Sequence, residues 1–342
     1  MLPEHGFKSN DRLVIHRLAR DEVSDEFAQD VRRGLAGSPK TLAPRYFYDD
    51  LGSQLFEAIC LLPEYYLTRA ESEILTSHAR EIVSSVEGPV RLIELGSGSA
   101  DKTRHLIEAL LAKQPELHYL PIDISDVALD RSSAVLLHIY PRLRITAYAA
   151  DYFTALRALS EAGVTASQGK RTLALFLGSN IGNFNPDEAV AFLAEIRKML
   201  RPEDALLVGA DLKKPASLLV PAYDDALGVT SAFNRNLLAR INRELDANFD
   251  ITRFEHQAIY NERLGRVESH LVSLQAQAVS IRALDLEVHF EPGETIHTEN
   301  SYKFDLEQLA ELARQAGFCL TKTWFDGARR YSFNLMSACD PS

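Results

Sequence analysis

The segment IELGSGSADKT, residues 93–103, carries the clearest pattern for ligand chemistry in the chain. Gly96 and Gly98 lie between an apolar run and a helical pattern, and glycines let a ligand approach the backbone closely. Such a loop at the carboxyl end of a strand is where open α/β sheets bind nucleotides. A plain glycine-rich turn would look the same, so the loop alone does not identify a ligand.

Acidic residues at successive strand ends narrow the choice of ligand. A dinucleotide site requires G-x-G-x-x-G and an acid about 20 residues further on. Here Asp101 occupies the third glycine position, and Asp123 lies 29 residues after Glu94. This spacing is more typical of a sheet that binds S-adenosylmethionine than of the sheet of a nicotinamide oxidoreductase.

The S-adenosylmethionine interpretation assigns a role to each acid that follows the glycine loop. Asp123 would accept hydrogen bonds from both ribose hydroxyls, and Asp151 would bind the adenine amino group. Tyr152 would lie beside the adenine ring. Each acid alone could be a helix cap or a solvated charge, but successive strand ends share one edge of a parallel sheet.

The fourth apolar run ends in FLGSNIGNFNP, residues 176–186, at the position that faces the transferred methyl group. Gly178 would let a substrate approach the backbone, and Asn183 would bind a substrate carboxylate or amine. Asn185 is followed by Pro186 and is interpreted as a helix cap only.

The elements that must position these residues alternate between apolar runs and helical patterns from residue 90 onward, which predicts a parallel sheet with helices on both faces. The predicted strands are 91–95, 117–123, 143–149, 172–178 and 205–212. After residue 214 the pattern changes to helical segments, antiparallel strands and a final strand pair that resembles the closing hairpin of a methyltransferase sheet.

This change of pattern predicts two domains. Residues 70–213 and 303–342 would form a Rossmann-like class I methyltransferase sheet that binds S-adenosylmethionine. Residues 1–69 and 214–302 would form an α+β substrate-binding domain from the N-terminus and an insertion. Thr68 and Glu71 fit a capping box that opens a helix to about residue 83.

Composition excludes several classes of function. The 342 residues carry 48 acidic and 37 basic side chains, and a net charge of −11 disfavours nucleic acid and anionic membranes as partners. No apolar stretch has the length of a spanning helix, and the first residues do not resemble a secretory signal. Three widely spaced cysteines predict a reducing, cytoplasmic location with no disulfide framework and no metal site.

Six sequence blocks together resemble the histidine Nα-methyltransferases of ergothioneine biosynthesis, from about residue 40 to 338. These blocks are YFYDDLGSQLFEAICLLPEYYLTRAE, IELGSGSADKT, PIDIS, LFLGSNIGN, AYDDALGVTSAFN and TENSYKF. The resemblance implies three successive methyl transfers from S-adenosylmethionine to the α-amine of L-histidine, which gives the betaine hercynine. It implies no metal and no obligate protein partner.

The resemblance also implies the site residues, which fall into three groups. The implied catalytic residues are Tyr48 and Asn183. The implied substrate-binding residues are Tyr65, Gly178, Asn183, Tyr223, Glu299 and Ser301. The implied cofactor-binding residues are Gly96, Lys102, Asp123, Asp151 and Tyr152.

Physical chemistry is consistent with these roles. Glu299 and Ser301 are two residues apart, so on a strand they point the same way and can bind the two imidazole nitrogens. Tyr48 can contact the amine, since an aromatic face tolerates a quaternary ammonium. No strong general base is evident in the sequence. Ser269 and His270 replace a methionine and an aromatic residue that relatives often carry, so the ring pocket is expected to differ in size.

Two alternatives remain open. A methyltransferase of the same fold could act on another amino acid such as tryptophan, although an indole offers one donor and no acceptor to Glu299 and Ser301. A non-catalytic protein that binds S-adenosylmethionine would also have the cofactor loop, but would not need the amine-binding residues.

Overall fold

The computed structural model describes residues 11–18, 21–164 and 169–339. Its largest element is an eight-stranded sheet with the order β1-β5-β4-β3-β6-β7-β14-β13. Strands β1 to β7 of this sheet are parallel, and β14 and β13 are antiparallel. The bounds are β1 Leu13–Arg17, β3 Val90–Leu95, β4 Leu117–Asp123, β5 Leu143–Ala149, β6 Arg171–Phe176, β7 Ala205–Asp211, β13 Phe318–Phe325 and β14 Tyr331–Ala338.

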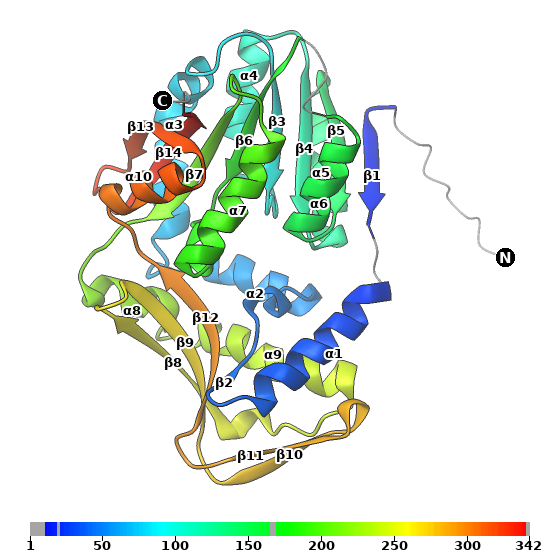
Figure 1. The fold of residues 1–342 in the computed structure, drawn as a ribbon, viewed down its shortest axis with the longest axis vertical. Coiled ribbons are helices and arrows are strands. Elements are labelled where there is room, and N and C mark those ends of the chain that lie inside the picture. Colours follow the sequence, from blue (N-terminus) through cyan, green and yellow to red (C-terminus); the bar gives the residue numbers. More distant parts are fainter. Residues whose placement is uncertain (1–10, 19–20, 165–168, 340–342) are drawn as a thin grey trace, which may run out of the picture.

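Helices cover both faces of this sheet (Figure 1). All six residues of β3 are buried, because Leu92 packs into the core on one face and Ile93 into the core on the other. One face is covered by α3 Leu67–Ser84, α4 Arg104–Lys113 and α5 Asp126–Ile139. The other is covered by α6 Tyr152–Glu161, α7 Pro186–Met199 and α10 Leu306–Gln315.

The chain reverses direction across the sheet between β3 and β6. From β3 it proceeds outward to β4 and β5, then returns to place β6 on the other side of β3. In open α/β sheets, ligands bind beyond the carboxyl ends of the strands at such a reversal. The predicted parallel sheet and its closing hairpin are confirmed, and they place the glycine loop at this position.

A second, smaller region lies beyond the carboxyl ends of the parallel strands (Figure 1). Its sheet has the order β2-β12-β9-β8, and a separate hairpin joins β10 to β11. The strands are β2 Lys40–Thr41, β8 Phe254–Asn261, β9 Arg266–Ser273, β10 Gln277–Ile281, β11 Leu286–Phe290 and β12 Thr295–Tyr302. The helices are α1 Asp21–Ala36, α2 Asp50–Cys60, α8 Ala216–Tyr223 and α9 Val229–Leu245. Short 3-10 turns are η1 Pro44–Phe47, η2 Asn180–Asn183, η3 Ile251–Arg253 and η4 Arg282–Leu284.

This smaller region draws on the two segments that the sequence assigned to a substrate-binding domain, residues 1–69 and 214–302. Residues 1–10 of that assignment lie outside the described residues. Strand β1 departs from the predicted boundary, since Leu13–Arg17 pairs with β5 in the large sheet. The division into two domains stays a proposal.

The structure overturns two local predictions. Helix α3 begins at Leu67 with Tyr66 as its N-cap and no side-chain cap, so Thr68 and Glu71 form no capping box. Cys319 and Cys339 form a disulfide, because β13 and β14 are paired and bring their Cα atoms to 5.0 Å despite a sequence separation of 20. In the described part of the chain, no helix is long and apolar enough to cross a membrane.

Candidate active site

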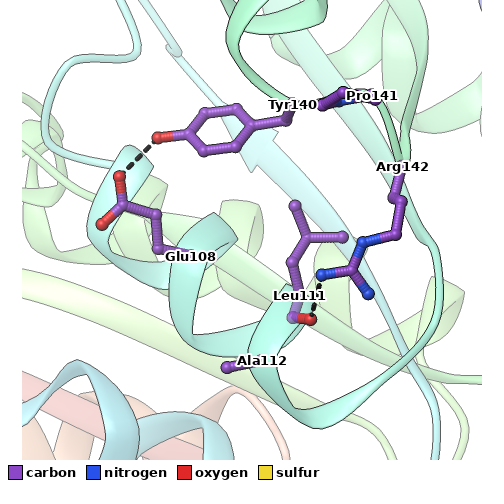
Figure 2. Close-up of a pocket in the computed structure, with 6 residues that line it drawn as sticks. All are labelled: Glu108, Leu111, Ala112, Tyr140, Pro141 and Arg142. Atoms are coloured by element: carbon purple, nitrogen blue, oxygen red, sulfur yellow. Dashed lines mark hydrogen bonds between the residues drawn. The ribbon is translucent and has the colours of Figure 1, made fainter.

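The residues implied by the sequence converge between the carboxyl ends of the parallel strands and the smaller sheet. A separate surface pocket of about 280 Å³ lies at the opposite end of the large sheet, between α4 and the segment that enters β5 (Figure 2). That pocket is lined by Glu108, Leu111, Ala112, Tyr140, Pro141 and Arg142. Its polar groups bond to one another, as in the contact of the Tyr140 hydroxyl with Glu108 at 2.5 Å, and it contains none of the predicted site residues.

The glycine loop is held open by backbone hydrogen bonds and by Asp123. Gly96 has φ 74° and donates its N–H to the Ile122 carbonyl at 2.8 Å. Asp123, the last residue of β4, accepts from the Gly98 N–H at 2.8 Å and from the Ser125 N–H at 2.9 Å. Burial raises the pKa of Asp123, and these backbone bonds act against that rise. The carboxyl is therefore fixed beside the loop with lone pairs left for a ligand.

Two side chains lie directly against Gly96. A Cβ atom at this position would be 2.7 Å from the Tyr152 hydroxyl and 3.0 Å from the Asn180 side-chain nitrogen. The Tyr152 ring packs on Phe176 and Phe192, with centroids 5.6 and 5.5 Å away. A larger residue at position 96 would therefore clash with both polar groups.

Glu94 braces the loop from inside the sheet. Its carboxylate accepts from the Thr103 hydroxyl at 2.6 Å and from the Tyr119 hydroxyl, and the residue is 3% exposed. Burial raises the pKa of Glu94 to about 7, against the effect of those hydrogen bonds. Of the three acids near strand ends, Glu94 is thus a support for the loop, whereas Asp123 borders the site.

The Lys102 side chain is paired with a carboxylate on α3. Its Nζ donates to Glu71, and the lysine side chain stays 32% exposed while the Glu71 side chain is 1% exposed. The other Glu71 oxygen accepts from the Gly178 N–H at 2.6 Å and from the Tyr331 hydroxyl at 2.6 Å. Glu71 therefore connects the glycine loop to the turn after β6. The sequence missed this role because the spacing from Thr68 suggested a helix cap.

Aromatic side chains form the wall opposite the large sheet. The Tyr48 ring packs edge-on against Phe56 and Phe233, at centroid distances of 5.6 and 5.8 Å. Tyr65 contacts Phe56 and Tyr223, both at 6.2 Å. The residues of this wall come from the end of η1, where Tyr48 is the C-cap, from the loop before α3, and from helices α2, α8 and α9.

A β-bulge in β12 directs Glu299 and Ser301 to the interior. His297 pairs with His270 and Glu299 with Ser269, so β12 contains one extra residue at this point. Before the bulge the buried positions are Ile296 and Thr298, and after it they include Ser301. The bulge therefore places Glu299 and Ser301 on one face. Ser269 lies directly across from Glu299, where cross-strand partners share a face.

Ser301 belongs to a hydrogen-bonded group with Tyr223 and Lys303. The Tyr223 and Ser301 hydroxyl oxygens are 2.9 Å apart. The Lys303 ammonium donates to both oxygens, at 2.7 and 2.8 Å, and forms an ion pair with Asp211 at 2.9 Å. Lys303 and Asp211 have fully buried side chains. Asp211 ends β7, so this group links the large sheet to β12.

Electrostatics set the protonation of the groups in the interior. Burial raises the pKa of Glu299 to about 7, and the positive charge of Lys303 acts against this rise. Burial raises the pKa of Tyr48 well above its usual 10.0, and the negative charge of Glu299 adds to the effect. The Tyr48 phenol is therefore protonated at neutral pH and cannot remove a proton from a substrate.

The remaining implied residues lie at the turns that border the site. Asp151 caps α6 by accepting from the Phe153 and Thr154 N–H groups at 2.9 and 3.0 Å. Asn183 is the last residue of η2, which packs so closely on β12 that a Cβ on Gly182 would be 2.7 Å from the Tyr302 carbonyl. Asn185 caps α7, as the sequence predicted.

Sequence reasoning missed four residues that this arrangement uses: Glu71, Asn180, Asp211 and Lys303. Asn180 and Lys303 lie inside the quoted blocks LFLGSNIGN and TENSYKF, and Asp211 ends a predicted strand. A buried-charge argument could have found Asp211, because an acid at the end of an apolar strand needs a partner. Among the described residues, no group of three or more His, Cys, Asp or Glu could hold a metal ion.

Comparison with known proteins identifies the family of this chain. A family described as histidine-specific methyltransferase, SAM-dependent, matches residues 27–338. The histidine N-alpha-methyltransferase of Mycolicibacterium smegmatis is 42% identical over 318 residues, covering 93% of this chain and 97% of the relative. The enzyme of the same name from Mycobacterium tuberculosis is 39% identical, covering 94% and 98%.

A fungal relative matches over part of its length. Ergothioneine biosynthesis protein 1 of Schizosaccharomyces pombe is 29% identical over 311 residues, covering 89% of this chain and 39% of the relative. The family match extends over both the large sheet and the smaller region. The chain therefore belongs to the family of SAM-dependent, histidine-specific methyltransferases.

Proposed function

We propose that this enzyme transfers three methyl groups in turn from S-adenosylmethionine to the α-amine of L-histidine and releases hercynine. The observation that carries the proposal is the pair Glu299 and Ser301 on one face of β12, enclosed beside Tyr223. The names of the two bacterial relatives support histidine as substrate, and the name of the fungal relative supports a place in ergothioneine biosynthesis.

Glu299 and Ser301 would recognise the imidazole ring. A neutral ring has one N–H donor and one lone-pair nitrogen. The Glu299 carboxylate would accept the N–H, and the hydroxyl side of the pocket would donate to the other nitrogen. A site that leaves buried polar groups unpaired with the wrong ligand rejects that ligand strongly. This reasoning favours histidine over tryptophan, whose ring has one donor and no acceptor.

Asn183 would hold the carboxylate and so fix the α-carbon, while Tyr48 would contact the amine. Tyr223 belongs to the hydroxyl side of the pocket, beside Ser301. The bound S-adenosylmethionine supplies an electrophilic methyl group on its sulfonium. The protein has to hold the amine in line with that methyl group and unprotonated, which is catalysis by positioning. After the third transfer the nitrogen carries a permanent charge, which the face of Tyr48 can tolerate.

The amine would lose its proton to solvent before it is enclosed. Tyr48 is the nearest candidate base, but its raised pKa keeps the phenol protonated at neutral pH. The α-amine of a free amino acid lies beside its own carboxylate and is more basic than a peptide terminus, whose pKa is near 8, so its neutral fraction grows as the pH becomes alkaline. We infer that turnover increases with pH through this range without an enzyme base.

On the cofactor side, Asp123 would accept from the ribose hydroxyls, and Asp151 would bind the adenine amine. Lys102 would bind the cofactor carboxylate, because its partly exposed ammonium has donors beyond the one that Glu71 takes. Gly96 would give the ligand access to the backbone, and Tyr152 would move from its contact with Gly96 to flank the bound cofactor.

The test is product analysis by mass spectrometry. Purified protein is incubated with S-adenosylmethionine and an equimolar mixture of the twenty amino acids. The proposal predicts that histidine alone gains methyl groups, up to three. Methylation of tryptophan or another amino acid would overturn the substrate and leave the fold and cofactor assignment standing. Binding of S-adenosylmethionine with no product would favour a non-catalytic binding protein.

A further inference from the structure

Lys303 is a fully buried ammonium whose three hydrogens all have acceptors. They go to Asp211 Oδ2 at 2.9 Å, Tyr223 Oη at 2.7 Å and Ser301 Oγ at 2.8 Å. A lysine has three donors and no acceptor, so no hydrogen remains to contact a ligand. Lys303 can act on a substrate only through its neighbours.

The hydrogen bonds from Lys303 limit what Tyr223 and Ser301 can offer a ligand. Each hydroxyl has one hydrogen and two lone pairs, and each gives one lone pair to Lys303. The two hydroxyls also share one hydrogen bond at 2.9 Å. The hydroxyl that accepts it has both lone pairs used and offers only a donor. The other hydroxyl offers only an acceptor.

We propose that Lys303 is a positioning residue that fixes the direction of the Tyr223 and Ser301 hydroxyls, so that the substrate meets one donor and one acceptor in set places. The inference rests on the proposed function, because it assigns these hydroxyls to the amino acid substrate. Without Lys303, both hydroxyls regain lone pairs and can rotate, and the pocket no longer distinguishes a lone-pair nitrogen from an N–H.

The charge of Lys303 also supports substrate recognition, through its effect on Glu299. Burial lowers the pKa of Lys303, but the Asp211 carboxylate and the Tyr223 hydroxyl together outweigh burial and raise the pKa, so the ammonium persists at neutral pH. This charge favours the ionised form of Glu299, the acceptor on β12. Loss of Lys303 should therefore raise the pKa of Glu299, and the acid side of the pH profile should move to higher pH.

Lys214 provides a matched control. Its ammonium contacts the same carboxylate, Asp211 Oδ1 at 2.6 Å, and the Tyr66 hydroxyl at 2.8 Å. Within the described part of the chain, its hydrogen bonds go to Asp211, Tyr66 and the Leu212 carbonyl, and not to Tyr223 or Ser301. Removal of either lysine takes one positive charge from Asp211, so both variants carry a similar cost in stability. Only removal of Lys303 frees the two hydroxyls.

The experiment compares Lys303→Met with Lys214→Met in full-length enzyme. For Lys303→Met we expect KM for histidine to rise about 10-fold or more, as for loss of charge-assisted hydrogen bonds. We expect Kd for S-adenosylmethionine to change by less than about 2-fold, and the acid limb of kcat/KM to move to higher pH. For Lys214→Met, KM and the acid limb should stay as in the wild type.

Equal effects of the two substitutions, or an unmoved acid limb in Lys303→Met, would overturn the inference and leave a structural role alone. Asp211 keeps Lys214 and Tyr66 as partners in Lys303→Met, which favours folding. If that variant does not fold, the pair Asp211→Asn with Lys303→Met removes both charges and carries the same expectation. If the wild type methylates another amino acid, the proposed function fails, and the same comparison with that substrate still tests Lys303.

Discussion

The cofactor side of the site is assembled from turns at the ends of neighbouring strands, whereas the substrate side is assembled from side chains of segments far apart in the chain. Gly96, Asp123 and Asp151 each follow or end a strand of one parallel sheet. Tyr48 follows η1, Tyr223 ends α8 and Glu299 lies in β12, and these three residues are more than 70 positions apart in the sequence. The first kind of site is therefore visible in short motifs, and the second requires the fold.

Each side contains a lysine–carboxylate pair, Lys102 with Glu71 and Lys303 with Asp211, and the two lysines differ in exposure. The Lys102 side chain is 32% exposed and Glu71 takes one of its hydrogens, which leaves donors for a ligand. The Lys303 side chain is fully buried, with every hydrogen directed at protein. A lysine near a site can therefore bind a ligand only if some of its ammonium hydrogens remain free of protein acceptors. A lysine whose three hydrogens all bond to protein instead fixes the position of those protein groups.

The largest effect is expected on the cofactor side from Asp123→Ala. Two hydrogen bonds to a charged acceptor contribute about 1.5–3 kcal/mol each, so Kd for S-adenosylmethionine should rise about 100-fold or more. Titration calorimetry measures it. Asp101→Ala, at an exposed acid of the same loop, serves as control and should leave Kd within about 2-fold. An unchanged Kd in Asp123→Ala would remove the ribose contact from the account.

On the substrate side, Glu299→Gln should raise KM for histidine about 10-fold, because the amide keeps an acceptor but loses the charge that strengthens the hydrogen bond to the ring. Kd for S-adenosylmethionine should not change. Glu268→Gln is the matched control, since Glu268 pairs with Arg266 on the other face of the same sheet. Equal loss of both ligands in Glu299→Gln would contradict a division of the site into two sides.

The pH dependence of kcat/KM gives a second test of the substrate side. The pKa of Glu299 is raised to about 7, so its carboxylate is present above pH 7 and is lost as the pH falls through 7. In the wild type, kcat/KM should therefore fall below about pH 7 more steeply than the titration of free histidine explains. Glu299→Gln does not titrate there, and free histidine behaves alike in both assays, so the difference between the two profiles isolates this carboxyl. Identical profiles would assign the fall to another group, such as Glu94, whose pKa is also raised to about 7.

The smallest effect is expected from Glu71→Gln. The amide keeps an acceptor for the Gly178 N–H and the Tyr331 hydroxyl but loses the charge that pairs with Lys102. Kd for S-adenosylmethionine should rise about 3- to 10-fold, since a partly exposed ion pair contributes little. Glu73→Gln changes a carboxylate on the same helix that bonds to the Gly327 N–H instead, and it should leave Kd unchanged. A loss in Glu71→Gln as large as in Asp123→Ala would mean that Glu71 orders the whole loop.

The parallel sheet was predictable because each strand is an apolar run between turn residues. The predicted strands 117–123 and 143–149 match β4 and β5 at both ends. The glycine loop and Asp123 were predictable for the same reason, since strand ends of one sheet share an edge. No local sequence pattern places Tyr48 and Glu299 in one site, because they lie far apart in the chain. Only the family resemblance suggested that they meet.

Other features could not be predicted because they depend on contacts between distant segments. Glu71 fits a capping pattern, but tertiary contacts with Lys102 and Tyr331 decide its role. The Cys319–Cys339 disulfide depends on the pairing of β13 with β14. The bulge in β12, which directs Glu299 inward, has no glycine or proline to mark it in TIHTENSY.

The most direct test of the account is a crystal structure of the enzyme with S-adenosylhomocysteine and histidine. We expect the ribose to lie at Asp123 and the imidazole between Glu299 and Ser301. The α-amine should lie beside Tyr48 and be directed at the cofactor sulfur. Lys303 should keep its bonds to Tyr223 and Ser301. A histidine whose ring lies away from Glu299, or whose amine is turned from the sulfur, would contradict the proposed recognition of the ring and positioning of the amine.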